Sequence, residues 1–171
     1  MNDHREITVL VADDHPGMLD VTSRRLEGQG MKTVGKARDG IEALEQIERL
    51  QPSVAVLDLR MPGLNGIEVA RKAQRSAPDT AIIIYTGFAD QAFLNEALDS
   101  GVKGFLNKEG PLEDLPRAAL AVAQGGTYID PVLAGVLVAT PTSTAPQLSN
   151  ASAKTCCRCC CCSPSASLDS C

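Results

Sequence analysis

The chain has 171 residues, of which 44% are hydrophobic and 22% are charged, and its formal net charge is −5 at pH 7. This length suits one compact domain with an appendage, because a domain typically needs ~100–150 residues. The negative charge argues against the basic surface that is typical of nucleic-acid-binding proteins. Since only 3% of the residues are aromatic, we expect an aliphatic core, as in a parallel sheet that helices cover on both faces.

The N-terminal residues and the length of the apolar runs indicate a cytoplasmic protein. Residues 1–6 are polar or charged apart from the first methionine, and they lead into an apolar run without the pattern of a signal peptide. The longest late apolar run, residues 132–139, is far shorter than the ~20 residues of a membrane helix. We therefore expect no membrane segment.

Short apolar runs alternate with amphipathic stretches in the first three quarters of the chain. Five runs predict strands, at residues 7–11, 31–34, 54–57, 81–84 and 102–106, and the run at 31–34 is weaker and predicts a place nearer an edge of the sheet. A helix is predicted after each strand, because apolar residues recur at helical spacing until a glycine or proline ends the stretch. The first of these helices covers residues 17–29, and the apolar faces of the others comprise Ile41, Leu44, Ile47 and Leu50; Ile67, Ala70 and Ala73; Phe93, Leu94, Ala97 and Leu98; and Leu112, Leu115, Ala119 and Val122.

Five strand–helix units in a row predict an α/β fold. Right-handed crossovers then place helices on both faces of a doubly wound, five-stranded parallel sheet. The composition changes after residue 126, where prolines, serines and threonines become frequent. We therefore expect a domain over residues 1–126, a linker over 127–150 with a short helix at Val132–Val138, and a separate tail over 151–171.

Polar side chains follow four of the five predicted strands. Asp13 and Asp14 follow the first, Asp58 the third, Thr86 the fourth and Lys108 the fifth. Each has a plainer interpretation when taken alone: a helix-capping aspartate, a turn threonine or a solvated lysine. Ligands of open α/β sheets, however, bind outside the carboxyl ends of the strands. The joint placement of all five residues at that edge favours one site.

The chemistry of such a site follows from its groups. Clustered carboxylates repel one another unless a cation neutralises them, and Mg²⁺ prefers hard oxygen ligands. A carboxylate beside this ion, with a hydroxyl and an ammonium group in reach, can accept a phosphoryl group. Asp58 follows the central buried strand and precedes a glycine-containing loop, so we predict that Asp58 is the nucleophile.

Four segments resemble the receiver domain of bacterial response regulators. They are the acidic opening VLVADDHP at residues 9–16, the phosphoacceptor segment VLDLRMPGLNG at 56–66, YTG at 85–87 and GFLNK at 104–108. The resemblance covers residues 6–125 and is greatest to the NarL/LuxR type. It implies a flavodoxin-like sheet with strand order 2-1-3-4-5.

The resemblance also implies a ligand set for Mg²⁺. Asp14 and Asp58 would bind the ion directly, and Asp13 would hold it through water. The backbone carbonyl of Arg60 would supply a further oxygen.

The same resemblance implies a phosphorylated switch rather than an enzyme acting on a separate substrate. Asp58 would take the phosphoryl group from a sensor histidine kinase, Thr86 would hydrogen-bond it and Lys108 would pair with it. Phe105 matches an aromatic residue that turns inward on activation, although it also suits a plain core position. A homodimer is a further partner that this family leaves open.

All seven cysteines lie in the last sixteen residues: Cys156, Cys157, Cys159, Cys160, Cys161, Cys162 and Cys171. LuxR-type regulators carry a helix-turn-helix domain at this place, and Leu148-Ser149-Asn150 matches its opening. The following residues do not, but the degeneracy of the codons permits a shifted reading frame that encodes the pattern Arg-Glu-Arg-Glu-Asp-Val-Leu. We therefore expect the tail to lack DNA binding, which only an intact ancestral transcription factor would have. The alternative interpretation is a thiolate site for Zn²⁺ or Cu(I).

Overall fold

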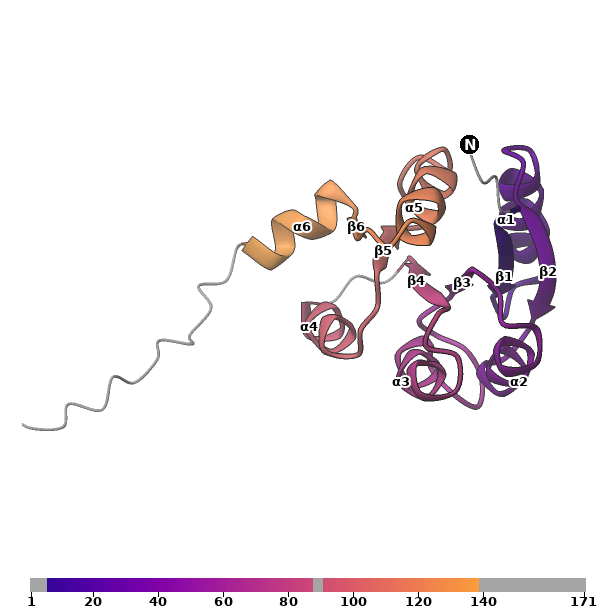
Figure 1. The fold of residues 1–171 in the computed structure, drawn as a ribbon. Helices are drawn as coiled ribbons and strands as arrows, with labels where there is room; N and C mark the ends of the chain where they lie inside the picture. Colours follow the sequence, from indigo (N-terminus) through magenta and orange to yellow (C-terminus); the bar gives the residue numbers. More distant parts are fainter. Residues whose placement is uncertain (1–5, 88–90, 139–171) are drawn as a thin grey trace, which may run out of the picture. The chain divides into compact units, whose positions relative to one another are not determined.

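The computed structural model describes residues 6–87 and 91–138. In this part of the chain, six parallel strands form one sheet in the order β2-β1-β3-β4-β5-β6 (Figure 1). The strands are β1 (Thr8–Ala12), β2 (Lys32–Ala37), β3 (Val54–Leu57), β4 (Ala81–Thr86), β5 (Gly104–Asn107) and β6 (Tyr128–Ile129). The helices are α1 (Pro16–Glu27), α2 (Gly40–Leu50), α3 (Gly66–Ser76), α4 (Gln91–Asp99), α5 (Asp114–Ala123) and α6 (Pro131–Val138). The predicted doubly wound parallel sheet and the order 2-1-3-4-5 are confirmed, and β6 is an addition at the β5 edge.

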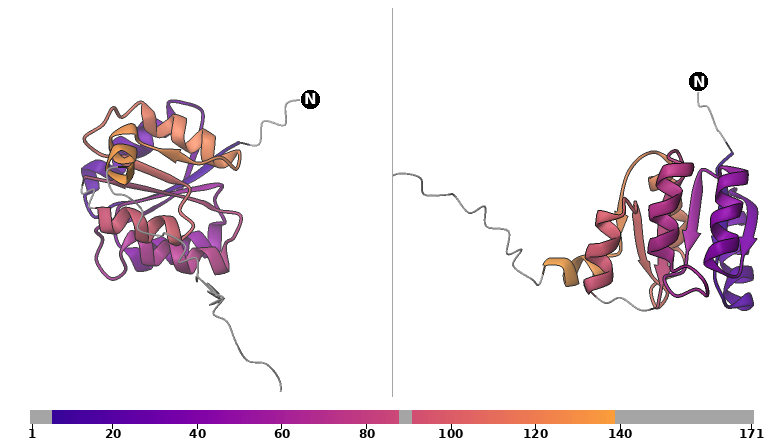
Figure 2. Two further views of the ribbon diagram at one scale, coloured as in Figure 1. Left: turned by 90° about the vertical axis from the view of Figure 1, so that its left-hand side faces the viewer. Right: turned by 90° about the horizontal axis from the view of Figure 1, so that it is seen from below.

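Helices cover both faces of the sheet, because successive side chains of a strand point to opposite sides. Leu10, Leu57 and Ile84 face a core cluster that contains residues of α2, α3 and α4. Their neighbours Val9, Val56 and Ile83 face a second cluster with residues of α1 and α5. Figures 1 and 2 show these two helical layers on either side of the strands. Strand β3 is buried along its whole length, which agrees with its central place in the sheet.

Local signals at helix ends fix the loops that border the carboxyl edge of the sheet. The Asn65 side chain accepts a hydrogen bond from the Glu68 backbone N–H, and the Glu68 side chain accepts one from the Asn65 N–H. This capping box begins α3 and satisfies two backbone donors that the helix cannot pair. The loop that follows Asp58 therefore has a defined end.

The buried face of α2 differs from the prediction. Ala43 and Ile47 are fully buried, whereas Ile41 and Leu50 are 53% and 37% exposed. Ala43 and Ile47 are four residues apart and share one helix face. Ile41 lies two residues before Ala43 and so points to a different side. The predicted helix is correct, but Ile41 does not belong to its buried face. Leu50 lies on the same face as Ala43 and Ile47, next to Gly35 of β2, and is partly exposed at the last residue of the helix.

The sheet continues past the expected domain boundary at residue 126. β6 pairs with β5 through Gly104 with Tyr128 and Phe105 with Ile129, and α6 contacts α4 and β5. The short helix expected in the linker is thus present, and its Leu133 is 1% exposed. Residues 139–150 and the Cys-rich tail, with the predictions made for them, lie outside the described residues. Among the helices that are described, none is long and apolar enough to cross a membrane.

Candidate functional site

The carboxyl ends of β1, β3, β4 and β5 lie side by side, because these strands are neighbours in the sheet. Backbone hydrogen bonds continue the pairing one residue beyond the strands. The Asp58 N–H donates to the Ala12 carbonyl at 2.9 Å, and the Lys108 N–H donates to the Thr86 carbonyl at 2.9 Å. The residues predicted for one site therefore begin from adjacent, rigid backbone positions.

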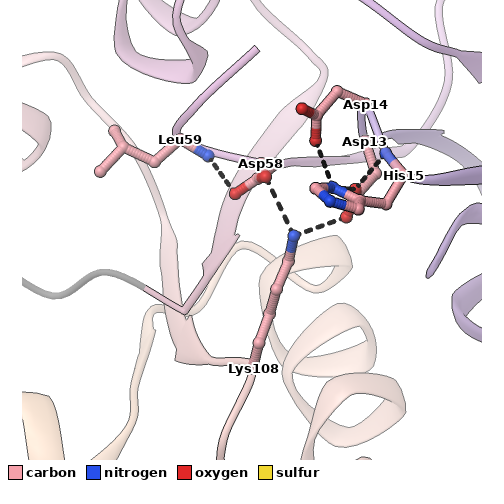
Figure 3. A network of polar contacts seen from close by, with 6 residues as sticks. All are labelled: Asp13, Asp14, His15, Asp58, Leu59 and Lys108. Atoms are coloured by element: carbon pink, nitrogen blue, oxygen red, sulfur yellow. Dashed lines mark hydrogen bonds and ion pairs between the residues drawn. The ribbon is translucent and has the colours of Figure 1, made fainter.

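Lys108 joins the two buried acids of this edge (Figure 3). Its Nζ lies 2.6 Å from Asp13 Oδ2 and 3.0 Å from Asp58 Oδ2. The Lys108 side chain is 17% exposed, and the side chains of Asp13 and Asp58 are 5% and 9% exposed. One ammonium group thus bridges two carboxylates that would otherwise repel each other in a poorly solvated place, and it offsets one of their two negative charges.

The same contacts change the acidity of Lys108. Burial by itself lowers the pKa of a lysine, because it disfavours the charged form. The hydrogen bonds to Asp13 and Asp58 and the negative charges of both acids act in the opposite direction and outweigh burial. The pKa of Lys108 is therefore raised above its usual value of 10.5, so the ammonium stays charged at neutral pH.

Asp14 and His15 lie at the open side of the cluster. The His15 backbone N–H donates to Asp13 Oδ1 at 2.9 Å, and Nδ1 of the His15 ring lies 2.7 Å from Asp14 Oδ1. The Asp14 side chain is 35% exposed and that of His15 is 74% exposed. Asp14 can therefore exchange its contacts with solvent more easily than Asp13 or Asp58 can.

The loop from β3 to α3 holds Asp58 in one orientation. The Leu59 backbone N–H donates to Asp58 Oδ1 at 2.7 Å, so Oδ2 is the oxygen that faces Lys108. Gly66 lies against the Asp58 backbone, and a Cβ at Gly66 would collide with the Asp58 carbonyl oxygen. Gly63 has φ +79°, a conformation that favours glycine. Both glycines are thus needed for the path of the loop.

A cavity of about 440 Å³ opens beside this loop. It is lined by Asp14, Leu59, Arg60, Met61, Pro62 and Asn65. Side-chain ligand atoms of Asp13, Asp14 and His15 lie within 4.8 Å of one another, as a metal-binding group would require. The ammonium of Lys108 already bridges Asp13 and Asp58. Asp13, Asp14 and Asp58 thus offer carboxylate oxygens at an edge that already holds one positive charge, and such oxygens fit a hard cation.

The structure brings Asp13, Asp58 and Lys108 into direct contact, with Asp14 adjacent. Thr86, the last residue of β4, is 4% exposed at the same edge and pairs with Asn107 of β5. Phe105 is also 4% exposed, but it belongs to the core cluster with Leu94, Ala97 and Leu133. It therefore lies in the core of the fold, in agreement with the plainer interpretation of this residue, and its role as a switch stays a prediction.

Sequence reasoning missed two polar contributors at this edge. His15 contacts both acids that follow β1, and its place next to the acidic pair was a usable signal. Asp130 contacts the backbone of Asn107, the residue before Lys108. An aspartate directly before a proline that begins a helix is a capping signal, but it did not point to the site.

Known proteins share this fold and much of this sequence. The sequence model described as response regulator receiver domain matches residues 9–120. The oxygen regulatory protein NreC of Staphylococcus carnosus is 39% identical over 132 residues, which are 76% of this chain and 61% of that protein. The response regulator GacA of Pseudomonas protegens is 36% identical over 133 residues, 77% of this chain and 62% of its own length. The chain thus spans less than two thirds of these relatives.

A solved structure gives the same result. The signal receiver domain of the putative response regulator NarL from Mycobacterium tuberculosis superposes with a TM-score of 0.66 at 37% identity, and the match covers 70% of this chain and 98% of that domain. The matched family segment contains the whole acidic edge from Asp13 to Lys108. The chain therefore belongs to the response regulator receiver domain family.

Proposed function

We propose that this chain is a phosphorylated signalling switch whose phosphoacceptor is Asp58. The observation that carries this proposal is the Asp58 carboxylate itself, fixed at Oδ1 by the Leu59 N–H and facing the Lys108 ammonium through Oδ2. A nucleophile needs a fixed direction of attack, and a nearby cation stabilises the negative charge on the phosphoryl oxygens during the transfer. Asp58 has both, at an edge where the molecule is open to solvent through Asp14.

The reaction is a phosphoryl transfer between two side chains. Oδ2 of Asp58 attacks phosphorus, the P–N bond of a phosphohistidine on a sensor histidine kinase breaks, and the imidazole nitrogen keeps the electron pair. Asp14 and Asp58 would hold Mg²⁺ directly, Asp13 through water, and the Arg60 carbonyl would add an oxygen. The ion would neutralise negative charge on the phosphoryl oxygens.

Lys108 and Thr86 would stabilise the product. The Lys108 ammonium leaves Asp13 to pair with a phosphoryl oxygen on Asp58, since a dianionic group attracts it more than one carboxylate does. The Thr86 hydroxyl hydrogen-bonds a second phosphoryl oxygen. Phe105 lies in the core next to this strand end and would repack as Thr86 moves. Each molecule modifies itself once, so the chain acts as a signal carrier and not as an enzyme with turnover on a separate substrate.

The relatives suggest the wider setting of the switch. NreC and GacA are named as regulatory proteins, and other similar structures include a LuxR-family regulator and an RcsB–DNA complex. We propose that this chain shares their phosphorelay input through a sensor histidine kinase. Homodimerisation remains part of this proposal, whereas DNA binding is proposed only for an ancestral form with an intact helix-turn-helix.

Mass spectrometry of the intact protein tests the phosphoacceptor. The protein is incubated with acetyl phosphate and Mg²⁺, and we expect it to gain one phosphoryl group, which EDTA prevents. Asp58→Asn should gain none. Asp20→Asn is the matched control, because Asp20 also pairs with a lysine, Lys36 at 2.9 Å, but is exposed on α1. A phosphoryl gain by Asp58→Asn at the parent's rate would refute the assignment.

A further inference from the structure

Asp130 is a buried carboxylate between β6 and α6 that the proposed reaction does not use. It is 6% exposed. Its backbone N–H donates to the Phe105 carbonyl at 2.8 Å, and its carbonyl accepts the Ala134 N–H at 2.8 Å. Its side-chain Oδ1 accepts the Val132 N–H at 2.9 Å. Asp130 is therefore both the end of the added strand and the cap of α6.

Lys108 sits in a tight turn next to this carboxylate. The Gly110 N–H donates to the Asn107 carbonyl at 3.1 Å, and the Glu109 N–H donates to Asn107 Oδ1 at 3.0 Å. The turn is tied to β4 through the hydrogen bond from the Lys108 N–H to the Thr86 carbonyl. The backbone of Thr86 is thereby linked directly to the backbone of the turn.

The second oxygen of Asp130 lies against both ends of this turn. Oδ2 accepts the Asn107 N–H at 3.4 Å, and a Cβ on Gly110 would lie only 3.2 Å from the same oxygen. At this length the hydrogen bond is weak. It is weaker than the two hydrogen bonds that Asp130 accepts from α6, from the Val132 N–H at 2.9 Å and the Ala134 N–H at 2.8 Å. One carboxylate thus joins the turn that carries Lys108 to the first turn of α6.

Packing links the same two regions. Leu133 of α6 is 1% exposed and shares its core cluster with Phe105 of β5 and with Leu94 and Ala97 of α4. Val132, on the other side of the helix, is 67% exposed. Among residues 131–135, whose burial is described, Leu133 is the one buried apolar side chain of α6. This leucine and the Asp130 cap therefore hold the first part of the helix on the receiver.

We propose that Asp130 couples the turn around Lys108 to α6, so that phosphorylation of Asp58 loosens this helix. The proposal rests on the proposed function. When the Lys108 ammonium moves from Asp13 toward a phosphoryl group, the turn shifts and the long bond between Asn107 and Asp130 breaks. Helix α6 then loses part of its support and carries the signal to the chain that follows it. Asp130 is a positioning residue in this scheme, since it touches no reacting atom.

Hydrogen exchange of the full chain, with and without beryllium fluoride and Mg²⁺, tests the coupling. In the parent we expect changed exchange over residues 104–110 and roughly five-fold faster exchange over 131–138, as for the loss of one weak hydrogen bond. Asp130→Asn keeps an oxygen to cap Val132, but its amide group would face the Asn107 N–H with another donor. This variant should keep the response at 104–110 and lose the response at 131–138.

Two further variants separate coupling from simple helix capping. Asp39→Asn makes the same substitution at the carboxylate that caps α2, and the response of α6 should stay as in the parent. Gly110→Ala leaves the cap intact and crowds Asp130 Oδ2 and the Asn107 carbonyl, each 3.2 Å from the new Cβ. Gly110→Ala should weaken the response of α6 as Asp130→Asn does. If Asp130→Asn does not fold, Gly110→Ala alone tests the coupling.

The outcomes are distinct. The coupling is refuted if 131–138 responds equally in the parent and in both Asp130→Asn and Gly110→Ala, or if it does not speed up in the parent while 104–110 responds. If neither segment responds and Asp58 gains no phosphoryl group from acetyl phosphate, the proposed function fails and the coupling fails with it.

Discussion

Removing the charge of Lys108 should destabilise the protein in the absence of divalent cations. In Lys108→Met the side chain keeps an unbranched apolar stem of similar length up to Cε, but Asp13 and Asp58 lose the ammonium that both contact, at 2.6 and 3.0 Å. The two carboxylates are then left nearly buried and mutually repulsive. The folded state loses stability, because in the unfolded chain water solvates both groups.

The magnitude follows from the burial of the three groups. Removing one partner of a fully buried ion pair costs about 3–5 kcal/mol, and a fully exposed pair contributes about 0–1 kcal/mol. Lys108 is 17% exposed, and water reaches the cluster beside Asp14. We therefore expect a loss of about 2 kcal/mol in the free energy of unfolding, between these limits.

Urea unfolding in EDTA at neutral pH measures this loss. The chain has no tryptophan, so far-ultraviolet circular dichroism is the appropriate signal. The matched control is Lys36→Met, since Lys36 contacts Asp20 at 2.9 Å but the two side chains are 43% and 63% exposed. We expect a change below about 0.5 kcal/mol for this control. The dependence on urea should keep its slope in both variants, as the folded surface is unchanged.

The double variant Lys108→Met/Asp13→Asn identifies the cause. It removes the repulsion together with the ammonium, so it should recover much of the lost stability, as expected for residues in contact. Excess Mg²⁺ should also stabilise Lys108→Met more than the parent, because the ion no longer competes with the ammonium. If Lys108→Met costs no more than Lys36→Met, the reasoning about the buried cluster is wrong.

Three further predictions concern pH, metal binding and the tail. The pKa of Lys108 is raised in the folded state, so the stabilisation by its ammonium is complete below the unfolded pKa of 10.5 and is lost as the pH rises through the folded pKa. The difference in unfolding free energy between parent and Lys108→Met should therefore shrink above pH 10.5. A constant difference in urea titrations at alkaline pH would contradict this. Asp14→Ala should weaken Mg²⁺ binding by about tenfold or more in calorimetric titration, since even residues that only orient a metal ligand contribute that much. The control Asp20→Ala should bind Mg²⁺ as the parent does. Equal affinities of Asp14→Ala and the parent would exclude Asp14 as a ligand. Truncation after Ser149 should leave the stability of the receiver unchanged, since the buried residues of its described part end at Leu133. The full chain should not shift promoter DNA in a gel at physiological salt, because residues 151–171 offer only Lys154 and Arg158 as phosphate contacts. Specific binding at nanomolar concentration would show that the interpretation of the tail is wrong.

The sequence by itself determined the fold class and the residues of the acidic edge. Alternation of apolar runs with helical periodicity requires a parallel sheet with covered faces. Parallel strands end at one common edge, so the positions of Asp13, Asp58 and Lys108 directly after their strands predict that these three residues lie close together. The resemblance to receivers added roles for Thr86, Arg60 and Phe105 that periodicity could not supply.

The limits of sequence reasoning appear most clearly at α6. Its sequence, PVLAGVLV, is apolar on every side, so no periodic pattern shows which residue is buried. Strand β6 has only two residues, too few for an alternation to be seen. Only the packed structure shows that this segment extends the sheet and buries Leu133. The face of α2 was misjudged for a related reason, because Ile41 is apolar but lies away from the sheet.

The tertiary structure alone decided which charges meet. Lys108 contacts Asp13 across 95 positions of the chain, and the ammonium takes one oxygen from each of two acids while the Leu59 N–H takes the other oxygen of Asp58. Such contacts depend on distance and burial at the scale of an ångström, and chain order does not encode either. The same holds for Asp130, the aspartate that caps α6. The pairing of β6 with β5 brings Asp130 beside Asn107 in the turn around Lys108, and the sequence gives no sign of that pairing.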